Sequence, residues 1–172
     1  MNEITKKNEE KDLKISNKHF EILLKISLII GILIVSGFII YYLLKPEPGY
    51  VTFGILNEDK RAENYPTEAT VNETISFHLT VGNHLDRNFT FGFKIKKGNS
   101  NTIIGSFPSN GTLYLTLGNF TLKPNQGRIY GNYSISFLEA GEDQIIIAEL
   151  WEIINETEKF FNIMYIRLNI TN

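Results

Sequence analysis

The pattern of hydrophobic and polar positions divides the chain into an apolar stretch near the N-terminus and a longer part in which the two kinds alternate. The stretch from Ile26 to Leu44 contains no charged side chain and lies between Lys25 and Lys45. Its 19 residues span about 28 Å as a helix that rises roughly 1.5 Å per residue, close to the hydrocarbon thickness of about 30 Å in a bilayer. The stretch therefore predicts a transmembrane helix over residues 26–44.

After residue 50, apolar residues alternate with polar ones at the two-residue period of half-buried strands. Gly, Pro, Asn and Asp separate these stretches, as turns require. No helical period of useful length follows Leu44. We expect strands over residues 50–57, 75–82, 89–96, 102–107, 112–117, 129–137, 144–153 and 160–170.

The alternation also predicts partners and faces. Strands 75–82 and 89–96 flank the turn sequence NHLDRN, and we expect a hairpin with one apolar and one wet face. His78 falls on the wet face. In the later strand, the predicted inner positions are Ile129, Gly131, Tyr133, Ile135 and Phe137.

Seven or eight short strands with turn signals about every 8 to 12 residues predict an all-β fold, an immunoglobulin-like antiparallel β-sandwich preceded by a single transmembrane helix. The pattern favours a sandwich but does not separate it from a barrel. The predicted organisation is a cytoplasmic, mostly disordered tail over residues 1–25 that becomes helical near Lys18, the transmembrane helix over 26–44, a linker over 45–49 and an extracytoplasmic domain over 50–172.

Positive charge beside the apolar stretch predicts its orientation. Lysines lie close to its N-terminal side, at Lys11, Lys14, Lys18 and Lys25, whereas only Lys45 is close on the other side. The positive-inside rule therefore places the N-terminus in the cytoplasm and the β-rich domain outside the cell. The alternative is a cleaved signal peptide, but the apolar region exceeds the usual length of roughly 7 to 15 residues and no A-x-A-like cleavage site follows it.

Composition excludes several classes of site. The chain has no cysteine, so a disulfide, a thiolate metal site or a cysteine nucleophile cannot form. Its net charge of -2 and the lack of a basic half argue against nucleic acid as a partner. His78 and His84 are too few for a histidine zinc site, and no G-x-S-x-G elbow is present. We therefore expect no metal, no cofactor and no catalytic residue.

Other charged and aromatic residues have a simple structural interpretation. A solvated turn and strand face is predicted for Glu139, Glu142, Asp143, Glu149 and Glu152. Two carboxylates flanking a glycosidic bond would define the alternative, a carboxylate-based hydrolase. Lys94, Lys96 and Lys97 are predicted to protect an exposed edge strand against pairing, with a contact to anionic lipid or cell-wall polymer as the alternative. Trp151, the sole tryptophan, is expected to pack, with a carbohydrate or protein contact as the alternative.

Seven Asn-x-Ser/Thr sequons follow the apolar stretch, and none has proline in its middle position. They begin at Asn72, Asn88, Asn110, Asn119, Asn132, Asn155 and Asn169. Asn132 and Asn169 are predicted on outward strand positions and the other five in turns. The sequons indicate N-glycosylation of an exported domain. A composition rich in Asn, Ser and Thr is the alternative explanation for their number.

A likeness to a known family covers most of residues 50–171. It is carried by the late strand pair and by the motifs Tyr65-Pro66-Thr67, Thr70-Val71-Asn72-Glu73, Val81-Gly82-Asn83-His84 and Asn88-Phe89-Thr90. On these motifs the chain resembles an archaeal membrane-protein family, that of domain of unknown function 1616. The resemblance implies membrane helices joined to an extracytoplasmic all-β domain, although some members have several helices. The family has no assigned reaction, so no catalytic residue can be carried over.

Together these features predict a membrane-anchored, N-glycosylated β-sandwich that is a structural or protein-interaction module of the cell envelope and not an enzyme. The expected partners are membrane lipid and an envelope or membrane protein. One alternative is an accessory subunit of a larger membrane complex. A second is a carboxylate-based hydrolase of envelope polysaccharide. The expected location is the cell membrane, with one span, a cytoplasmic N-terminus and an extracellular C-terminal domain.

Overall fold

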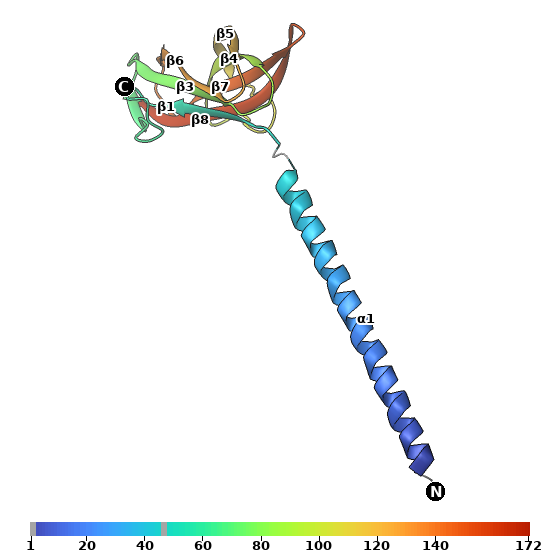
Figure 1. Cartoon of the computed structure of the whole chain (residues 1–172). Coiled ribbons are helices and arrows are strands. Elements are labelled where there is room, and N and C mark those ends of the chain that lie inside the picture. Colours follow the sequence, from blue (N-terminus) through green and yellow to red (C-terminus); the bar gives the residue numbers. More distant parts are fainter. Residues whose placement is uncertain (1–2, 46–47) are drawn as a thin grey trace. The chain divides into compact units, whose positions relative to one another are not determined.

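A computed structural model describes the backbone of residues 3–45 and 48–172, and the side chains of residues 18–45 and 48–172. The chain divides into two compact units, with the boundary between residues 47 and 48. The first unit contains a helix and the second contains strands (Figure 1). The two units are therefore described separately.

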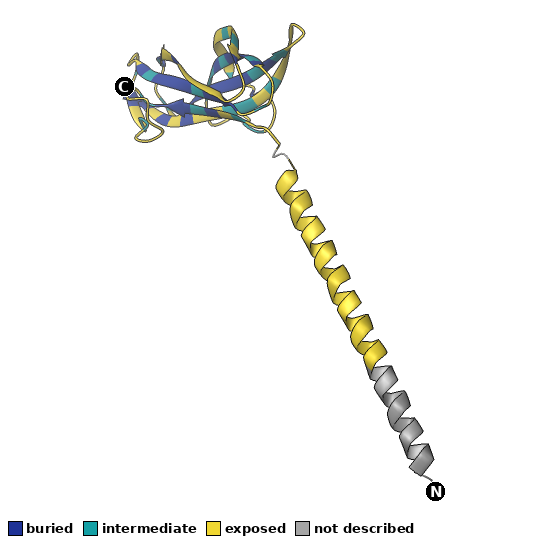
Figure 2. Cartoon of the chain, in the orientation of Figure 1, coloured by how far each residue is buried: buried dark blue, intermediate teal, exposed yellow. Residues whose placement is uncertain are grey.

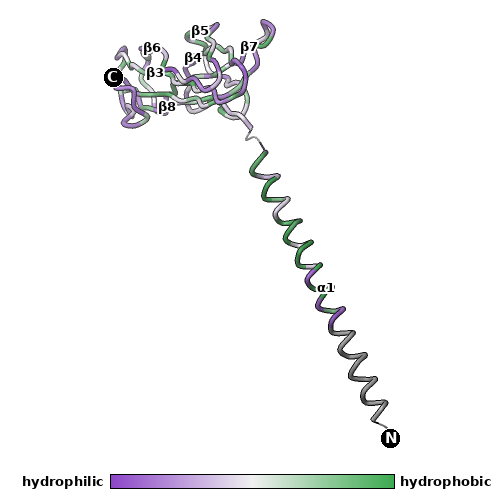
Figure 3. The backbone as a smooth tube through the Cα atoms, viewed as in Figure 1, coloured by the Kyte–Doolittle hydropathy of each residue, from purple (hydrophilic) through white to green (hydrophobic). Residues whose placement is uncertain are grey.

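Helix α1 extends from Glu3 to Leu44. Its segment Lys18–Leu44, 27 residues, is long and apolar enough to cross a membrane, and no other helix among the described residues meets that condition. In Figure 3 the described part of α1 has polar colouring next to the grey part and mostly apolar colouring over the remainder. Its large apolar side chains from Phe20 onward are all exposed (Figure 2), as expected of a helix whose surroundings are lipid. The helix supports a single-pass membrane protein.

The N-terminal tail differs from its prediction. The sequence predicts a mostly disordered segment over residues 1–25, whereas α1 already begins at Glu3 and not near Lys18. The leader contains no Gly or Pro, and extending a helix that the apolar segment has nucleated needs no second nucleation step. Residues 1–2 of the tail and residues 46–47 of the predicted linker lie outside the described residues.

Residues 48–172 form eight strands in two sheets. The strands are β1 Val51–Leu56, β2 Glu68–Thr70, β3 Ile75–Asn83, β4 Phe89–Gly98, β5 Thr112–Leu122, β6 Gln126–Ile135, β7 Gly141–Ile154 and β8 Thr157–Thr171. The three-stranded sheet has the order β1-β3-β6, and the five-stranded sheet has the order β2-β8-β7-β4-β5. Neighbouring strands are antiparallel except the short β2, which is parallel to β8.

Aromatic and branched side chains from both sheets fill one shared core. Phe89, Phe91 and Phe93 of β4 are completely buried. Across the core, the ring of Phe93 stacks on Phe53 at 6.0 Å, and the ring of Phe91 meets Tyr130 edge-on at 5.7 Å. Because these partners belong to the other sheet, the two sheets face each other and the domain is a β-sandwich. The predicted fold class, an all-β sandwich after a single helix, is confirmed.

The predicted hairpin between residues 75–82 and 89–96 is wrong. β3 pairs with β1 and β6, whereas β4 pairs with β5 and β7, so the chain crosses from one sheet to the other between them. Asn83 organises the crossing from a completely buried position. Its Nδ2 donates to the carbonyl of Arg87 at 2.8 Å and to that of Leu122 at 3.0 Å. These bonds satisfy two backbone carbonyls beside the crossing, one in the connection from β3 to β4 and one at the end of β5.

The side-chain phase of β6 reverses within the strand. Gly131 has a φ of +83° at a β-bulge, which shifts the alternation by one residue. Before the bulge, Tyr130 is buried and Ile129 is 43% exposed. After it, Ile135 and Phe137 are buried as predicted. Ile129 and Gly131 are therefore not inner positions.

Two short segments also differ from the prediction. Residues 102–107 form no strand and belong to the irregular connection between β4 and β5. The strand β2 was not predicted, because its three residues are too few to show an alternation. It lies beside β8 in parallel register, with Ala69 opposite Ile170.

Candidate functional site

The loop of residues 99–111, here called the capping loop, covers part of the outer face of the five-stranded sheet. Ile145 and Ile147 of β7 lie outside the sandwich core but are completely buried. A Cβ atom added at Gly111 of the loop would lie 3.0 Å from Ile147 Cδ1. The loop therefore packs directly on β7 and creates a second, smaller buried region.

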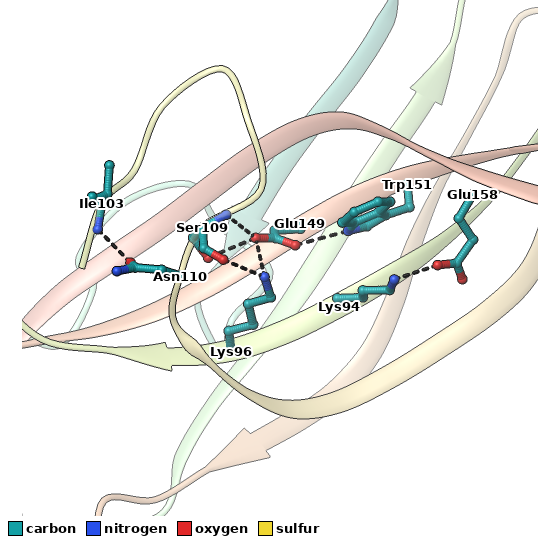
Figure 4. Close-up of polar contacts among 8 residues, drawn as sticks. All are labelled: Lys94, Lys96, Ile103, Ser109, Asn110, Glu149, Trp151 and Glu158. Carbon is teal, nitrogen blue, oxygen red and sulfur yellow. Dashed lines mark hydrogen bonds and ion pairs between the residues drawn. The ribbon is translucent and has the colours of Figure 1, made fainter.

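Beneath the capping loop, the fully buried carboxylate of Glu149 accepts four hydrogen bonds (Figure 4). Its Oε1 accepts from Lys96 Nζ at 2.8 Å, from Ser109 N at 2.7 Å and from Ser109 Oγ at 2.8 Å. Its Oε2 accepts from Trp151 Nε1 at 3.0 Å. Lys96 Nζ also donates to the Ser109 carbonyl at 2.8 Å. We call these four residues the Glu149 cluster, which joins β4, β7 and the capping loop.

The indole of Trp151 links the Glu149 cluster to the surface. Lys94 Nζ lies 4.0 Å from the centre of its ring and donates to Glu158 Oε2 at 2.5 Å. The ring of Phe160 contacts the indole edge-on at 5.7 Å. Trp151 is half-buried, so the expectation that it packs holds, and an ammonium group lies over its ring.

The three lysines of β4 do not protect an edge strand, because β4 lies between β7 and β5. Lys94 and Lys96 have the carboxylate partners described above. Lys97 Nζ donates to the Ser136 carbonyl and lies 4.7 Å from the ring centre of Tyr114. The prediction of edge protection is therefore wrong, and each lysine instead joins β4 to another segment.

A polar groove of about 460 Å³ lies beside the capping loop. Its walls present the amides of Asn99, Asn101, Asn110 and Gln144. Thr102 and Thr112 add hydroxyls, and Glu139 is the one carboxylate among the lining residues. Lys97 adds an ammonium group. Amides and hydroxyls supply both donors and acceptors, which suits polar ligands such as sugars or peptide backbone. Glycoside hydrolysis needs two carboxylates, and this groove has one.

All seven sequon asparagines are exposed. Asn119 lies within β5 and not in a turn as predicted. Asn110 Oδ1 accepts from Ile103 N at 2.8 Å, as Figure 4 shows, and Asn169 Oδ1 accepts from Asp143 N at 3.1 Å. Both bonds use the side-chain oxygen, so they leave the amide nitrogen, the atom to which an N-glycan is attached. The geometry is compatible with glycosylation at every sequon, and occupancy stays a prediction.

The two histidines of the domain have separate surroundings. His78 is buried, with Nδ1 3.2 Å from the Asn57 carbonyl, so its predicted place on a wet face is wrong. Asn57, the first residue after β1, thus gives the imidazole a backbone partner. His84 is exposed and stacks on Tyr50 at 4.6 Å. Among the described residues, no three His, Cys, Asp or Glu side chains are grouped to hold a metal ion.

Two of the five carboxylates predicted as solvated are buried, Glu149 and Glu152. Arg87 Nη2 lies 2.7 Å from Glu152 Oε1, an ion pair in which that oxygen accepts no aligned hydrogen bond. On the surface, Arg167 Nη1 donates to both oxygens of Asp143 at 2.6 Å. These bonds raise the pKa of Arg167 above its ordinary value.

The Glu149 cluster was missed at the level of sequence, although one signal was present. Residues 145–154 read IIIAELWEII, an apolar run that is interrupted by two carboxylates. A charge inside such a run is costly unless it is paired. Alternation alone placed Glu149 on the outer face, where it does lie, but could not show that residues 99–111 cover that face.

Comparison with known proteins gives weak structural likenesses. No family model and no curated protein matches the chain. The CARDB domain of a protein from Pyrococcus furiosus, solved in complex with di-metal ions, has a TM-score of 0.46 and 14% identity over 74% of this chain and 93% of that chain. A sporulation control protein from Bacillus subtilis has a TM-score of 0.46 and 9% identity, over 72% of this chain and 50% of that chain.

A β-glucosidase from Listeria innocua has a TM-score of 0.44 and 8% identity, over 72% of this chain and 16% of that chain. Similarity at this level does not support an inference about function. The fold assignment given above depends on the two sheets and their shared core, which are features of this chain itself.

Proposed function

We propose that this chain is a single-pass membrane protein whose β-sandwich is N-glycosylated outside the cell and acts as a structural or protein-interaction module of the envelope. The observation that carries the proposal is the exposure of all seven sequon asparagines. All of them lie in the β-rich unit, after the apolar helix. A sequon asparagine can carry a glycan only where it is exposed, because a glycan is bulky and polar.

The proposed orientation puts the N-terminus in the cytoplasm and the sandwich outside. Four of the lysines before Ile26 lie within about 15 residues of the apolar stretch, the distance over which positive charge biases orientation. Membership of the family with domain of unknown function 1616 is part of the same proposal. Its members join membrane helices to an extracytoplasmic β domain.

A binding role is favoured over a catalytic one by the chemistry of the groove and of the Glu149 cluster. The groove offers amides and hydroxyls beside one carboxylate, Glu139. The Glu149 carboxylate is completely buried, and its four hydrogen bonds come from three side chains and one backbone amide. A carboxylate held in this way stabilises the capping loop and is not positioned to act as an acid or base on a substrate.

A second candidate function, an accessory subunit of a larger membrane complex, is favoured by the surface of α1. A shallow concave strip on the helix is lined by small residues, Ser27, Gly31 and Ser36, between larger apolar ones. Small residues allow the backbone of a partner helix to approach closely in a membrane. In this second candidate function, the helix both anchors the domain and packs against a helix of the partner protein.

The test uses the full chain in intact cells. Protease added from outside should remove the sandwich and leave the lysine-rich leader, and mass spectrometry should find glycans on sequon asparagines. Loss of the leader with an intact sandwich would reverse the orientation and overturn the proposal. Gentle detergent extraction followed by sizing separates the two candidates. A monomer supports the first candidate, the envelope module. A stable larger particle that contains another protein supports the second candidate, the accessory subunit of a membrane complex.

A further inference from the structure

The strands β5 and β6 form one open side of the sandwich, here called the β5–β6 side. Each is the edge strand of its own sheet, β5 of the five-stranded sheet and β6 of the three-stranded sheet. They follow each other in the chain, separated by residues 123–125. Phe120 of β5 and Tyr130 of β6 touch, with ring centres 4.8 Å apart. The two free edges therefore lie next to each other.

This side has few of the features that normally keep edge strands from pairing. β5 has 11 residues without a charge or a proline, and eight of them are exposed. Leu113 and Tyr114 are 55% and 47% exposed. β6 has 10 residues, of which seven are exposed and only Arg128 is charged. Long, exposed, uncharged edge strands are templates for the addition of another strand. A second copy of this chain carries the same uncharged β5, so two copies can pair edge to edge.

The same two strands each contain a sequon, and in both strands the sequon falls in a β-bulge. On β5, Gly118 and Asn119 both lie opposite Gly92, between the pairs of the regular ladder. On β6, Gly131 and Asn132 both lie opposite His78. Asn119 has a φ of +62° and Gly131 a φ of +83°, so each bulge turns the backbone locally. A bulge re-aims a side chain and interrupts edge pairing.

The other two edges differ in length and in sequon content. β1 has six residues and β2 has three, and neither contains a sequon asparagine. A shorter edge strand gives less template for pairing than a longer one. The sequons inside edge strands thus occur on the two long edges only.

We propose that N-glycans on Asn119 and Asn132 shield the β5–β6 side and prevent edge-to-edge association of the sandwich with a second copy of this chain. The inference depends on the proposed function, because it requires an exported, glycosylated domain. A glycan rooted in each bulge occupies the space that an added strand needs. The glycans thus block edge pairing, which charged residues and prolines block in other edge strands and which β5 has neither to prevent.

The test removes the two sequons without changing the bulges. Thr121→Ala with Ser134→Ala deletes both hydroxyl positions but keeps Asn119 and its left-handed backbone. The matched control is Thr74→Ala with Thr157→Ala, which removes the sequons of Asn72 and Asn155 in turns. All four substituted residues are exposed. Size-exclusion chromatography with light scattering of the full chain in detergent, produced in glycosylating cells, gives the protein mass of each particle.

We expect the wild type and the control variant to run as monomers, and the Thr121→Ala, Ser134→Ala variant to reach at least twofold higher mass. Adding Thr116→Lys, a charge at an exposed position of β5, to this variant should restore the monomer, which shows that the variant had folded. Association of the control variant to the same extent would overturn the proposal, and so would a monomeric sequon variant.

Mass spectrometry of the wild type distinguishes a failure of the shielding role from a failure of the proposed function on which it depends. Glycans on Asn119 and Asn132 support the inference. If these two are empty while other sequons carry glycans, the shielding role is wrong and the proposed function stands. If every sequon is empty, the glycosylated module and the shielding role both fail.

Discussion

Lys96 Nζ lies 2.8 Å from Glu149 Oε1, and the two side chains are only 12% and 0% exposed. Removing two charges from water is costly, so a pair at this depth persists where further hydrogen bonds satisfy both groups. Ser109 and Trp151 provide those bonds. Because Ser109 belongs to the capping loop, the ion pair also fixes that loop on the sheet.

Lys96→Met should lower the free energy of unfolding by about 3–5 kcal/mol, because it leaves the Glu149 carboxylate buried and unpaired. Adding Glu149→Leu removes the second charge, and the double variant should be more stable than Lys96→Met alone. Urea unfolding followed by the fluorescence of Trp151 measures each value. A double variant less stable than the single one would contradict the buried-pair account.

The matched control is the ion pair two residues away on the same strand. Lys94 and Glu158 are 23% and 45% exposed, and surface pairs contribute about 0–1 kcal/mol. Lys94→Met should therefore lower the free energy of unfolding by about 1 kcal/mol or less. Equal losses for Lys94→Met and Lys96→Met would show that burial is not what distinguishes the two pairs.

Gly92→Ala should destabilise the sandwich, because the added Cβ would lie 2.7 Å from the Leu117 carbonyl oxygen of β5. The expected loss is about 1–3 kcal/mol, as for other overpacked sites. Gly118→Ala is the control, since a Cβ there has no atom within 4 Å, and its effect should stay within about 0.5 kcal/mol. Thermal unfolding of both variants checks the difference, and a neutral Gly92→Ala would argue against close packing at this bulge.

Periodicity predicted the elements that face a uniform environment. The apolar run from Ile26 and the stripe of Phe89, Phe91 and Phe93 were both readable, because lipid or core surrounds every apolar position in them. Periodicity did not predict which strands pair with each other. A hairpin and a sheet crossing after β3 give the same alternation, and the difference lies in the buried hydrogen bonds of Asn83.

The candidate site was less predictable than the fold, because it depends on contacts distant in sequence. Glu149 is buried by Ser109, 40 residues earlier in the chain, and no local pattern encodes that cover. The phase of β6 failed for a different reason, since the positive φ of Gly131 shifts the alternation. The exposure of the sequon asparagines could be predicted from the sequence, because polar turn positions and outward strand positions face solvent in most folds.

The stability of the turn before β3 should depend on pH through Glu73. Its Oε2 accepts from Thr70 N at 2.7 Å and from Thr70 Oγ1 at 3.0 Å. The bond from the Thr70 backbone is the larger cause, and together they lower the pKa of Glu73 from its ordinary value of 4.5. A lowered folded pKa means that the stabilisation is fully present above 4.5 and is lost as pH falls through the folded value.

Glu73→Gln, which keeps the sequon at Asn72, should therefore be less stable than the wild type at neutral pH. The difference in the free energy of unfolding should remain constant down to about pH 5 and then shrink as the wild-type carboxyl is protonated. Denaturant unfolding of both proteins across this range tests the sign. A difference that widens in acid would mean that the carboxylate is not the stabilising form.

Membrane anchoring by α1 should be abolished by charges in the middle of its apolar segment. Ile32→Lys with Val35→Lys places two ammonium groups at the helix centre, at a combined insertion cost of about 5–7 kcal/mol. The full chain should then move from the alkali-resistant membrane fraction to the extractable fraction. His19→Lys is the control, because residue 19 precedes the apolar stretch, and it should leave the wild-type distribution unchanged. If the doubly charged helix still resists alkaline extraction, α1 does not hold the protein in the membrane by spanning it.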